Sequence, residues 1–433
     1  MYVLSKLQFK EARNNLKKGF DRNYWALVME GTMFNGGAVT IATSGVVALF
    51  IYTMMESNTL LGLAITLQGL LFTFGQLLGA PYVRTIRKLP EFLCKVMATQ
   101  RTIPILMAIP LFLSVSRHWA VTIFLILFGL FWFIDGANTV PWGELCARAV
   151  KPELRGHMMG VMTMAGGILS LLMGLLVTWL LATPRLNDYR RFAFIFVLGG
   201  VVFLTTAICI RFVHDPNPIT KPEKLNVKLF YAKIPSIIRH SSPLKYIIIA
   251  RIPSYIGLAS LSFLVLFGAH TLNLSDAQTS WLVYANIIGG IIGGAVLGGA
   301  SLRYGNKAII LMCNLGVVIA MAMAIILSLN PNLGYVWLFV MCALGSLSAS
   351  SWFGYFNYFI DIAPTKERSE YQIIGQCVGI PFSFVGVAMG AMIDIHGYVP
   401  IFIICGIFAL ITIVFSLRLL SKQKVAALAA ENG

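Results

Sequence analysis

The sequence predicts an all-α integral membrane protein in which twelve transmembrane helices form two pseudo-symmetric six-helix bundles. The first observation is composition: 58% of the 433 residues are hydrophobic, only 12% are charged, and the mean hydropathy is +0.80. These values lie outside the range of ordinary soluble domains. The second observation is a series of long apolar stretches, and the third is one long polar stretch that divides them six and six.

Each apolar stretch is long enough to cross a bilayer. A helix needs roughly 20 mostly apolar residues to span the hydrocarbon core, because each residue adds about 1.5 Å. A membrane barrel would show short alternating segments, so these continuous runs indicate helices. The expected spans are 24–54, 59–83, 94–115, 119–147, 157–183, 192–213, 244–270, 280–302, 308–329, 335–362, 371–393 and 399–420.

The distribution of charge predicts the topology. Residues 1–23 form a basic segment without an apolar run that could serve as a signal peptide. If this segment is cytoplasmic, most of the 33 Lys and Arg fall on the inner side, and the outer loops hold only Arg117, Arg185, Arg190 and Arg191. This bias places both termini in the cytoplasm of a multi-pass protein of the cell's inner (plasma) membrane. We therefore interpret the net charge of +16 as setting the orientation in the membrane and favouring contact with anionic lipid. We expect no nucleic-acid partner.

The cysteines and histidines lack the spacings of metal or disulfide sites. The seven cysteines are scattered singly within or at the edges of the expected spans, without a CxxC pair. The six histidines form no HxxxH or HExxH pattern. We expect no disulfide framework, no metal site and no cofactor.

The polar stretch 214–243 separates the two expected bundles. Its prolines and lysines favour an exposed linker, and the part "NVKLFYAKIPSIIRH" could form a short amphipathic helix on the inner leaflet. The predicted organisation is the basic segment 1–23, a bundle over 24–213, the linker 214–243, a second bundle over 244–420 and a cytoplasmic tail over 421–433.

The two halves carry similar sequence motifs at equivalent positions. "GAPYVRTIRK" follows the second span and "GGASLRYGNK" follows the eighth. The first supplies Gly79, Arg84, Arg87 and Lys88, and the second supplies Gly298, Arg303, Gly305 and Lys307. The pairs Gly79/Gly298, Arg84/Arg303 and Lys88/Lys307 share one offset. A six-helix unit that occurs twice is a common construction of secondary transporters.

With these motifs the chain resembles the major facilitator superfamily across nearly its whole length. In that family the loop after the second helix reads Gly, three residues, Asp, Arg, any residue, Gly, Arg, then Arg or Lys. This chain has Val83 and Leu302 in place of the Asp, Ile86 in place of the second Gly and Asn306 in place of one basic residue. The resemblance implies a transporter that works by alternating access and whose basic loops help to lock the inner face. The alternative is that these Arg and Lys only set orientation.

Four ionisable residues lie well inside the expected spans, away from their ends: Glu30, Arg101, Asp135 and Arg251. A charge at mid-bilayer costs roughly 2.5–3.5 kcal/mol on insertion scales, so such groups are usually sheltered or functional. Aligning the first and seventh spans by their glycines puts Glu30 opposite Arg251. Since the resemblance implies that these two helices line the central cavity, we expect the pair, with Arg101, to serve coupling or gating. The alternative is that Arg251 reaches the inner surface and Glu30 is held by backbone and neighbouring polar groups.

Polar and aromatic side chains recur on single faces of several spans. Asp135, Asn138 and Trp142 follow a helical spacing and present a carboxylate, an amide and an aromatic wall. The alternative for Asp135 is a hydrogen bond within the helix bundle. The further candidates for the substrate cavity are Tyr255, Trp352, Tyr355, Asn357, Gln372 and Gln376.

These observations favour a secondary active transporter and not an enzyme, because the sequence has neither a nucleotide-binding loop nor a clustered catalytic set. A carboxyl group in a low-dielectric site can exchange a proton at physiological pH, so Glu30 or Asp135 could couple a small-molecule substrate to the proton gradient. Sodium is the alternative ion. We favour efflux of an amphipathic organic solute by a monomer, with cation-coupled uptake of a sugar or other metabolite as the alternative. A membrane-embedded sensor or enzyme on the same fold is the alternative of another class.

Overall fold

The computed structural model describes residues 20–43, 45–220, 224–274 and 276–431. The described residues form helices and their connections, without a strand. The chain divides into two compact units, the first comprising Met1–Met158 and Ala165–Asn226 and the second comprising Met159–Met164 and Val227–Gly433.

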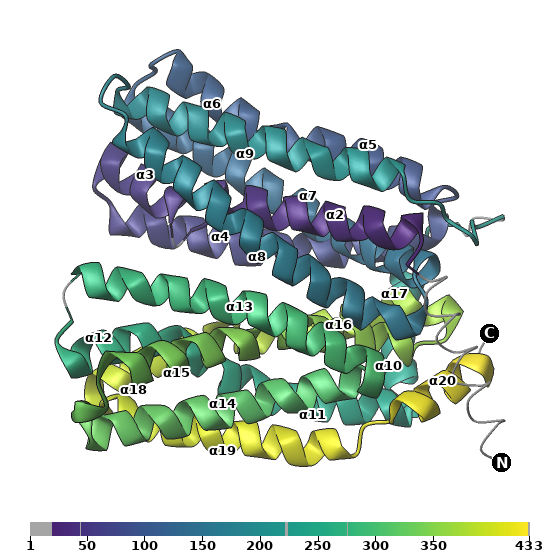
Figure 1. Cartoon of the computed structure of the whole chain (residues 1–433). Coiled ribbons are helices and arrows are strands. Elements are labelled where there is room, and N and C mark those ends of the chain that lie inside the picture. The colour runs from purple at the N-terminus through teal and green to yellow at the C-terminus, as the bar shows by residue number, and fades with distance from the viewer. Residues whose placement is uncertain (1–19, 44, 221–223, 275, 432–433) are drawn as a thin grey trace. The chain divides into compact units, whose positions relative to one another are not determined.

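The first unit consists of helices that run side by side along most of their length (Figure 1). Its elements are α2 (Arg22–Ala38), η1 (Val39–Ile41), α3 (Val46–Met55), α4 (Asn58–Gly79), η2 (Ala80–Thr85), α5 (Leu89–Arg101), α6 (Ile103–Phe112), α7 (Arg117–Ala149), α8 (Pro152–Ala182) and α9 (Asp188–Arg211). Residues Met159–Met164 of α8 are counted with the second unit.

The second unit begins with a short helix and continues with the second set of long helices (Figure 1). Its elements are α10 (Val227–His240), α11 (Ser242–Ala259), η3 (Ser260–Phe263), α12 (Leu264–Leu272), α13 (Asp276–Tyr304), α14 (Asn306–Leu329), η4 (Pro331–Leu333), α15 (Gly334–Ala349), α16 (Ser351–Asp361), η5 (Thr365–Glu367), α17 (Arg368–Cys377), η6 (Ile380–Phe384), α18 (Val385–His396), α19 (Tyr398–Leu417) and α20 (Lys422–Glu431).

Several helices begin at a residue whose side chain accepts a hydrogen bond from a free backbone N–H. Asp21 accepts from the Tyr24 N–H before α2, and Ser57 accepts from the Leu60 N–H before α4. Asn187 and Ser241 do the same for α9 and α11. Such caps satisfy donors that the helix itself leaves unpaired, each contributing about 1 kcal/mol.

The transmembrane prediction is confirmed. Among the described residues, eleven helical segments are long and apolar enough to cross a membrane, and each coincides with an expected span. The chain is therefore a multi-pass membrane protein. The remaining expected span, 371–393, is helical but interrupted, as α17, η6 and α18. The interruption coincides with Pro381, which lacks a backbone N–H and cannot continue the helical ladder.

Other expected spans are also divided. The first is split into α2 and α3, the third into α5 and α6 after Arg101, and the tenth into α15 and α16. Apolar length predicts a crossing but not an unbroken helix. In transporters, divided helices free backbone groups inside the membrane, where they can serve a binding site.

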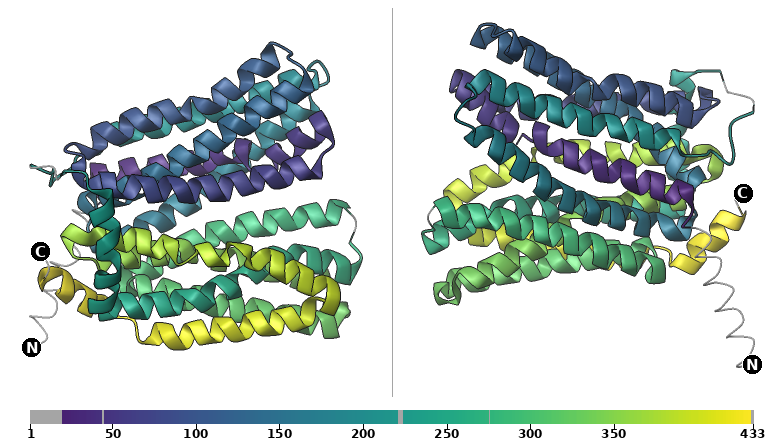
Figure 2. Two further views of the ribbon diagram at one scale, coloured as in Figure 1. Left: turned by 180° about the vertical axis from the view of Figure 1, so that it is seen from behind. Right: turned by 45° about the horizontal axis from the view of Figure 1, so that its top comes forward.

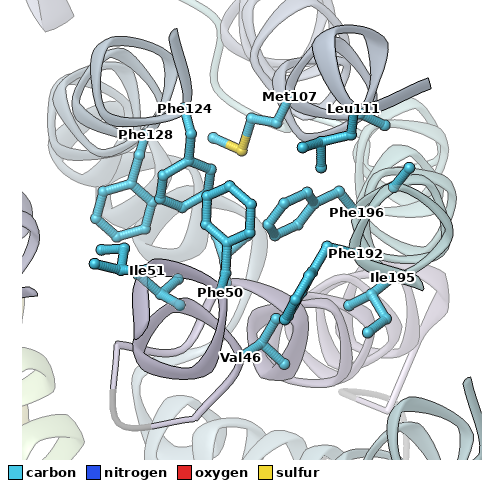
Figure 3. Packing of buried hydrophobic residues seen from close by; sticks show 14 of the residues in the cluster. Val46, Phe50, Ile51, Met107, Leu111, Phe124, Phe128, Phe192, Ile195 and Phe196 are labelled. Atoms are coloured by element: carbon cyan, nitrogen blue, oxygen red, sulfur yellow. The ribbon is translucent and has the colours of Figure 1, made fainter. Parts of the chain in front are cut away.

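Aromatic packing fills one end of the first unit. Figure 3 shows Phe50, Phe124, Phe128, Phe192 and Phe196 from three helices turned toward one another. The ring centroids of Phe50 and Phe124 lie 4.8 Å apart, and those of Phe124 and Phe196 are stacked at 5.3 Å. Offset and edge contacts of this kind add about 0.5–1.5 kcal/mol each beyond burial.

Close backbone contact fixes α4 against α7. A Cβ built on Gly75 would lie 2.0 Å from the Phe133 carbonyl oxygen, and one on Gly136 would lie 1.9 Å from the Phe72 oxygen. Only glycine fits at these crossings. Small residues commonly let membrane helices approach in this way. The crossing holds the part of α7 that carries the polar stripe.

The linker helix α10 lies across one end of the second unit, as the left view of Figure 2 shows. Its apolar side chains Ile234, Ile237 and Ile238 pack on a buried cluster that includes Tyr358 and Tyr371. Its basic residues Lys228, Lys233 and Arg239 are exposed. The predicted amphipathic segment is thus a helix with its apolar face covered by its own unit.

Candidate functional site

Asp135 is the centre of a buried network in the first unit. Its Oδ1 accepts hydrogen bonds from Arg101 Nη1 at 3.0 Å and from Gln100 Nε2 at 3.0 Å. Gln100 Nε2 also donates to the Phe131 carbonyl oxygen at 3.0 Å, and Gln100 Oε1 accepts from Asn138 Nδ2 at 3.2 Å. The end of α5 and the middle of α7 are therefore joined by an ion pair and two amides.

Aromatic rings enclose the arginine of this network. The Arg101 guanidinium lies 4.7 Å from the Phe34 ring centroid, 5.2 Å from that of Phe203 and 5.4 Å from that of Phe131. The residue is 1% exposed. Cation–π contacts and a charge-assisted hydrogen bond together offset the desolvation of a buried guanidinium. Arg101 is thus neutralised and enclosed within its own unit.

Glu30 lies in the same unit with a different kind of partner. It is 3% exposed, and its Oε2 accepts a hydrogen bond from Trp142 Nε1 at 3.0 Å. The charges of Arg101 and Asp135 both act on it. Within the described part of the chain, no cation forms an ion pair with Glu30. The two buried carboxylates of this unit are therefore unequal, since Asp135 has a paired cation and Glu30 has a neutral donor.

In the second unit, Arg251 of α11 is held between two tyrosines. Its guanidinium carbon lies 4.3 Å from the Tyr255 ring centroid and 4.0 Å from that of Tyr355. Tyr255 also stacks on Phe382, with centroids 5.5 Å apart and ring planes at 4°. The buried Nη1 of Arg251 has no hydrogen-bond partner among the described residues. This arginine is sandwiched by rings but not neutralised.

Two amides of the second unit are buried without partners. Asn357 is fully buried and Gln372 is 4% exposed, and both polar atoms of each side chain lack a hydrogen bond within the described residues. They lie on the adjoining helices α16 and α17. Of the other cavity candidates, Gln376 is half-buried and Trp352 is 44% exposed. Buried polar atoms without partners are costly, so they mark places where a ligand or water would be bound.

Comparison with known proteins relates the second half of the chain to a family by sequence and the whole chain to solved structures by fold. Residues 247–432 match the sequence profile of the Major Facilitator Superfamily. The proton:xylose symporter XylE, bound to a bromo-deoxyglucose, is similar with a TM-score of 0.72 at 13% identity, over 95% of this chain and 99% of that one.

Two further structures share the fold. A bacterial homologue of the iron transporter ferroportin, in an outward-facing state, has a TM-score of 0.70 at 12% identity, over 94% of this chain and 100% of that one. The human organic anion transporter MFSD10 has a TM-score of 0.63 at 14% identity, over 92% and 99%. No curated protein matches the chain by sequence.

Three residues of the loop motif have structural roles: one in helix packing, one in a turn and one in helix capping. A Cβ on Gly79 would lie 2.3 Å from the Ala137 carbonyl oxygen, so this glycine is required for packing against α7. Gly305 has a φ of +79°, which favours glycine between α13 and α14. Lys307 Nζ donates to the Leu417 and Leu419 carbonyl oxygens at 2.6 and 2.8 Å, and so caps the end of α19.

The remaining charged residues of the motif lie nearer the surface, whereas Gly298 is buried. Lys88 forms an exposed ion pair with Glu91 at 2.8 Å, and Arg87 is exposed. Arg84 lies in η2 and is half-buried. The Arg303 guanidinium lies 5.2 Å from the Tyr304 ring centroid. Gly298 lies in α13.

Sequence reasoning missed Gln100, Phe34 and Phe203. Gln100 is fully buried and contacts two other members of the network. A signal existed, because Gln100 and Arg101 stand together inside an apolar span and polar groups there require partners. The two phenylalanines carried no signal, since one aromatic residue among many apolar ones does not show which cation it will contact.

Proposed function

We propose that this protein is a secondary active transporter that moves a small organic solute by alternating access and couples it to protons through Glu30. In this proposal the protein works as a monomer in the inner (plasma) membrane with both termini in the cytoplasm. Efflux is the proposed direction. The observation that carries the proposal is the environment of Glu30, a carboxyl group buried in the membrane domain beside a neutral donor.

The two carboxylates differ in what a proton would do to them. An ionised carboxylate without a paired cation is costly to bury, and protonation removes that cost. Asp135 already has the guanidinium of Arg101 at 3.0 Å, so a proton would break a favourable pair. Glu30 has no such pair among the described residues in this conformation. Glu30 is therefore the better coupling group, and Asp135 is better suited to hold Arg101 and Gln100 in place.

The similar structures support coupling to protons. XylE is a proton:xylose symporter, and FucP of E. coli is a fucose:proton symporter. Their low identity to this chain supports the mode of transport without naming the solute. The aromatic side chains Tyr255, Tyr355 and Trp352 support a solute with an apolar surface.

We also propose that Glu30 and Arg251 pair in one conformation of the transport cycle and separate in another. Their positions in the first helices of the two halves support this pairing. The test exchanges the charges, and unfolding in detergent is compared for Glu30→Arg, Arg251→Glu and the double variant. The double variant is expected to be more stable than the sum of the two single losses predicts, and strictly additive losses would contradict the pairing.

The coupling proposal is tested by flux in proteoliposomes. Purified protein is reconstituted, a pH gradient is imposed, and a labelled sugar, amino acid, monocarboxylate and organic cation are each followed together with internal pH. For the solute that the wild type moves, Glu30→Gln should abolish accumulation driven by the gradient while exchange without a gradient persists. Glu30→Asp should retain part of the driven transport. Glu56→Gln, which changes an exposed carboxyl group at the end of α3, is the matched control and should behave as wild type.

Two results would contradict this function. Driven transport that survives Glu30→Gln without a change in pH dependence would remove Glu30 as the coupling group. Absence of flux for every solute class would favour a sensor or enzyme role. Comparing export with uptake in the same vesicles tests the proposed direction.

A further inference from the structure

Arg251 is a half-buried cation whose charge has no counter-charge among the described residues. The rings of Tyr255 and Tyr355 lie on it at 4.3 and 4.0 Å, which stabilises the guanidinium through its faces. Stacking leaves the N–H groups at the edge of the guanidinium free, and Nη1 is buried without a partner. The exposed edge of a stacked guanidinium is the part that binds a planar anion with two parallel hydrogen bonds.

Arg101 of the first unit provides an internal comparison. It too is enclosed by aromatic rings, but its Nη1 is already paired with Asp135. The two arginines thus have similar aromatic surroundings. Arg101 is paired with a carboxylate, whereas Arg251 has no anionic partner among the described residues.

Hydroxyl and amide groups without partners gather around the same stack. Ser254 follows Arg251 by three residues on α11 and therefore lies on the same face of the helix. Ser254 and Asn314 adjoin the Tyr355 hydroxyl. Ser254 Oγ and Asn314 Oδ1 lie within reach of Tyr355 Oη, but none of the three atoms has a hydrogen bond of good geometry within the described residues, and all three side chains are at least 98% buried. Two of these groups are hydroxyls that can donate to an anion.

Asn357 and Gln372 are two further buried amides of this unit whose polar atoms lack hydrogen bonds within the described residues. Asn357 follows Tyr355 by two residues on α16, a spacing that turns the two side chains to different faces of the helix. The polar groups next to the Arg251 stack are therefore those of Ser254, Tyr355 and Asn314.

We propose that Arg251 binds the carboxylate of the transported solute, and that the solute is a small organic monocarboxylate with further hydrogen-bonding groups. The number of negative charges on the anion favours a carboxylate over a phosphate ester. A carboxylate carries one negative charge and is neutralised by one guanidinium, whereas a phosphate monoester carries about −1.5 to −2 at pH 7 and would leave negative charge buried. Ser254 and the Tyr355 hydroxyl would bind the solute's other polar groups. The inference rests on the proposed transport function and names its substrate class.

Binding to the purified full-length protein tests the inference without any gradient. Thermal stability in detergent is measured with sodium lactate, gluconate and benzoate, with the corresponding amides lactamide, gluconamide and benzamide, and with glycerol phosphate. At least one carboxylate is expected to raise the unfolding temperature in a saturable way, and its amide and the phosphate ester are not. Saturable stabilisation reflects binding to the folded state.

Variants then assign the effect to Arg251. Arg251→Gln should weaken carboxylate binding by about tenfold or more, as expected for loss of one charge-assisted contact. Arg251→Lys keeps the charge without the planar edge and should lose less. Arg418→Gln removes an exposed arginine of the same unit and is the matched control, expected to bind as wild type. If Arg251→Gln does not fold, Ser254→Asp supplies the test, because a carboxylate one helical turn from Arg251 should repel the anion.

The outcomes separate this inference from the proposed function. Equal binding by the wild type and Arg251→Gln, or an amide that binds as well as its carboxylate, would overturn the anion site. Tighter binding of glycerol phosphate would overturn the choice of carboxylate. Driven transport of a neutral solute, with no carboxylate binding, would overturn this inference and leave proton-coupled transport standing. Carboxylate binding without proton-linked flux would support the anion site and overturn proton-coupled transport.

Discussion

Arg101 and Asp135 form an ion pair of 3.0 Å whose arginine is almost wholly buried, between the end of one helix segment and the middle of another. Taking two charges out of water is expensive, and their mutual attraction repays this only when hydrogen bonds satisfy both groups. Gln100 donates a hydrogen bond to Asp135, and the surrounding rings make cation–π contacts with Arg101. The pair therefore fixes α5 against α7 and orients the polar face of α7.

Removing one member of this pair should destabilise the protein more than removing both. Asp135→Leu leaves Arg101 buried without its counter-charge and should cost about 3–5 kcal/mol. Arg101→Met should cost a similar amount. The double variant should be less destabilised than either, because no buried charge remains. Unfolding in detergent, followed by tryptophan fluorescence, measures the three values.

The exposed pair Lys88–Glu91 is the control for this experiment. Glu91→Leu removes one member of an ion pair of similar length in the same unit, and water replaces the lost partner. No measurable change in unfolding is expected. A double variant at Arg101 and Asp135 as unstable as the sum of the singles would mean that the two residues act independently.

Two glycines of α4 make a matched test of helix packing. Gly75→Ala would place a methyl group 2.0 Å from the Phe133 carbonyl oxygen, whereas a Cβ on Gly62 meets nothing within 4 Å. Gly75→Ala should force α4 and α7 apart and lower stability by at least 1–3 kcal/mol, roughly the cost of overpacking. Gly62→Ala should be neutral or should stabilise the helix by about 0.5–1 kcal/mol. Equal unfolding temperatures for the two variants would show that the crossing tolerates separation.

The sequence predicts the transmembrane architecture well because apolar length is imposed by the bilayer itself. Continuity of the helices is less predictable. The interruption of the expected span 371–393 depends on Pro381 and on packing that hydropathy does not report. Similarly, the observed break between α5 and α6 after Arg101 has no counterpart in the apolar pattern of the third span.

At the candidate site, helical spacing correctly groups residues on one helix but not across helices. Asp135 and Asn138 do share a network, and Trp142 contacts Glu30 instead. Arg101 could be recognised as an intramembrane charge. Its partner Asp135 lies on another helix, and the periodicity of the sequence determines the rotation of that helix only coarsely. Glu30 and Arg251 stand out by their charge in both sequence and structure, while the burial of Asn357 and Gln372 required the packed helices.

Lys307 should contribute to stability as a cap on another helix. Its Nζ donates to the Leu417 and Leu419 carbonyl oxygens, which the end of α19 leaves without helical partners. Lys307→Gln should lower the free energy of unfolding by about 1 kcal/mol, since two charge-assisted bonds to partly solvated carbonyls are lost. Lys245→Gln changes an exposed lysine of the same unit and should have no effect. A similar loss for both variants would indicate that only the net charge matters.

Gly379 links the interrupted segment to the stack around Arg251. A Cβ at this position would lie 2.6 Å from the Tyr255 hydroxyl oxygen and 2.8 Å from the ring carbon that carries it. Gly379→Ala should therefore displace the Tyr255 ring from its position 4.3 Å over the guanidinium. We expect solute binding to weaken by about tenfold, corresponding to roughly 1.4 kcal/mol, with a smaller change in unfolding temperature because the tyrosine can move. Gly386→Ala, on α18 with nothing within 4 Å of its Cβ, is the control and should bind as wild type. If Gly379→Ala binds solute normally while Tyr255→Leu does not, the ring is needed but its position is not set by the glycine.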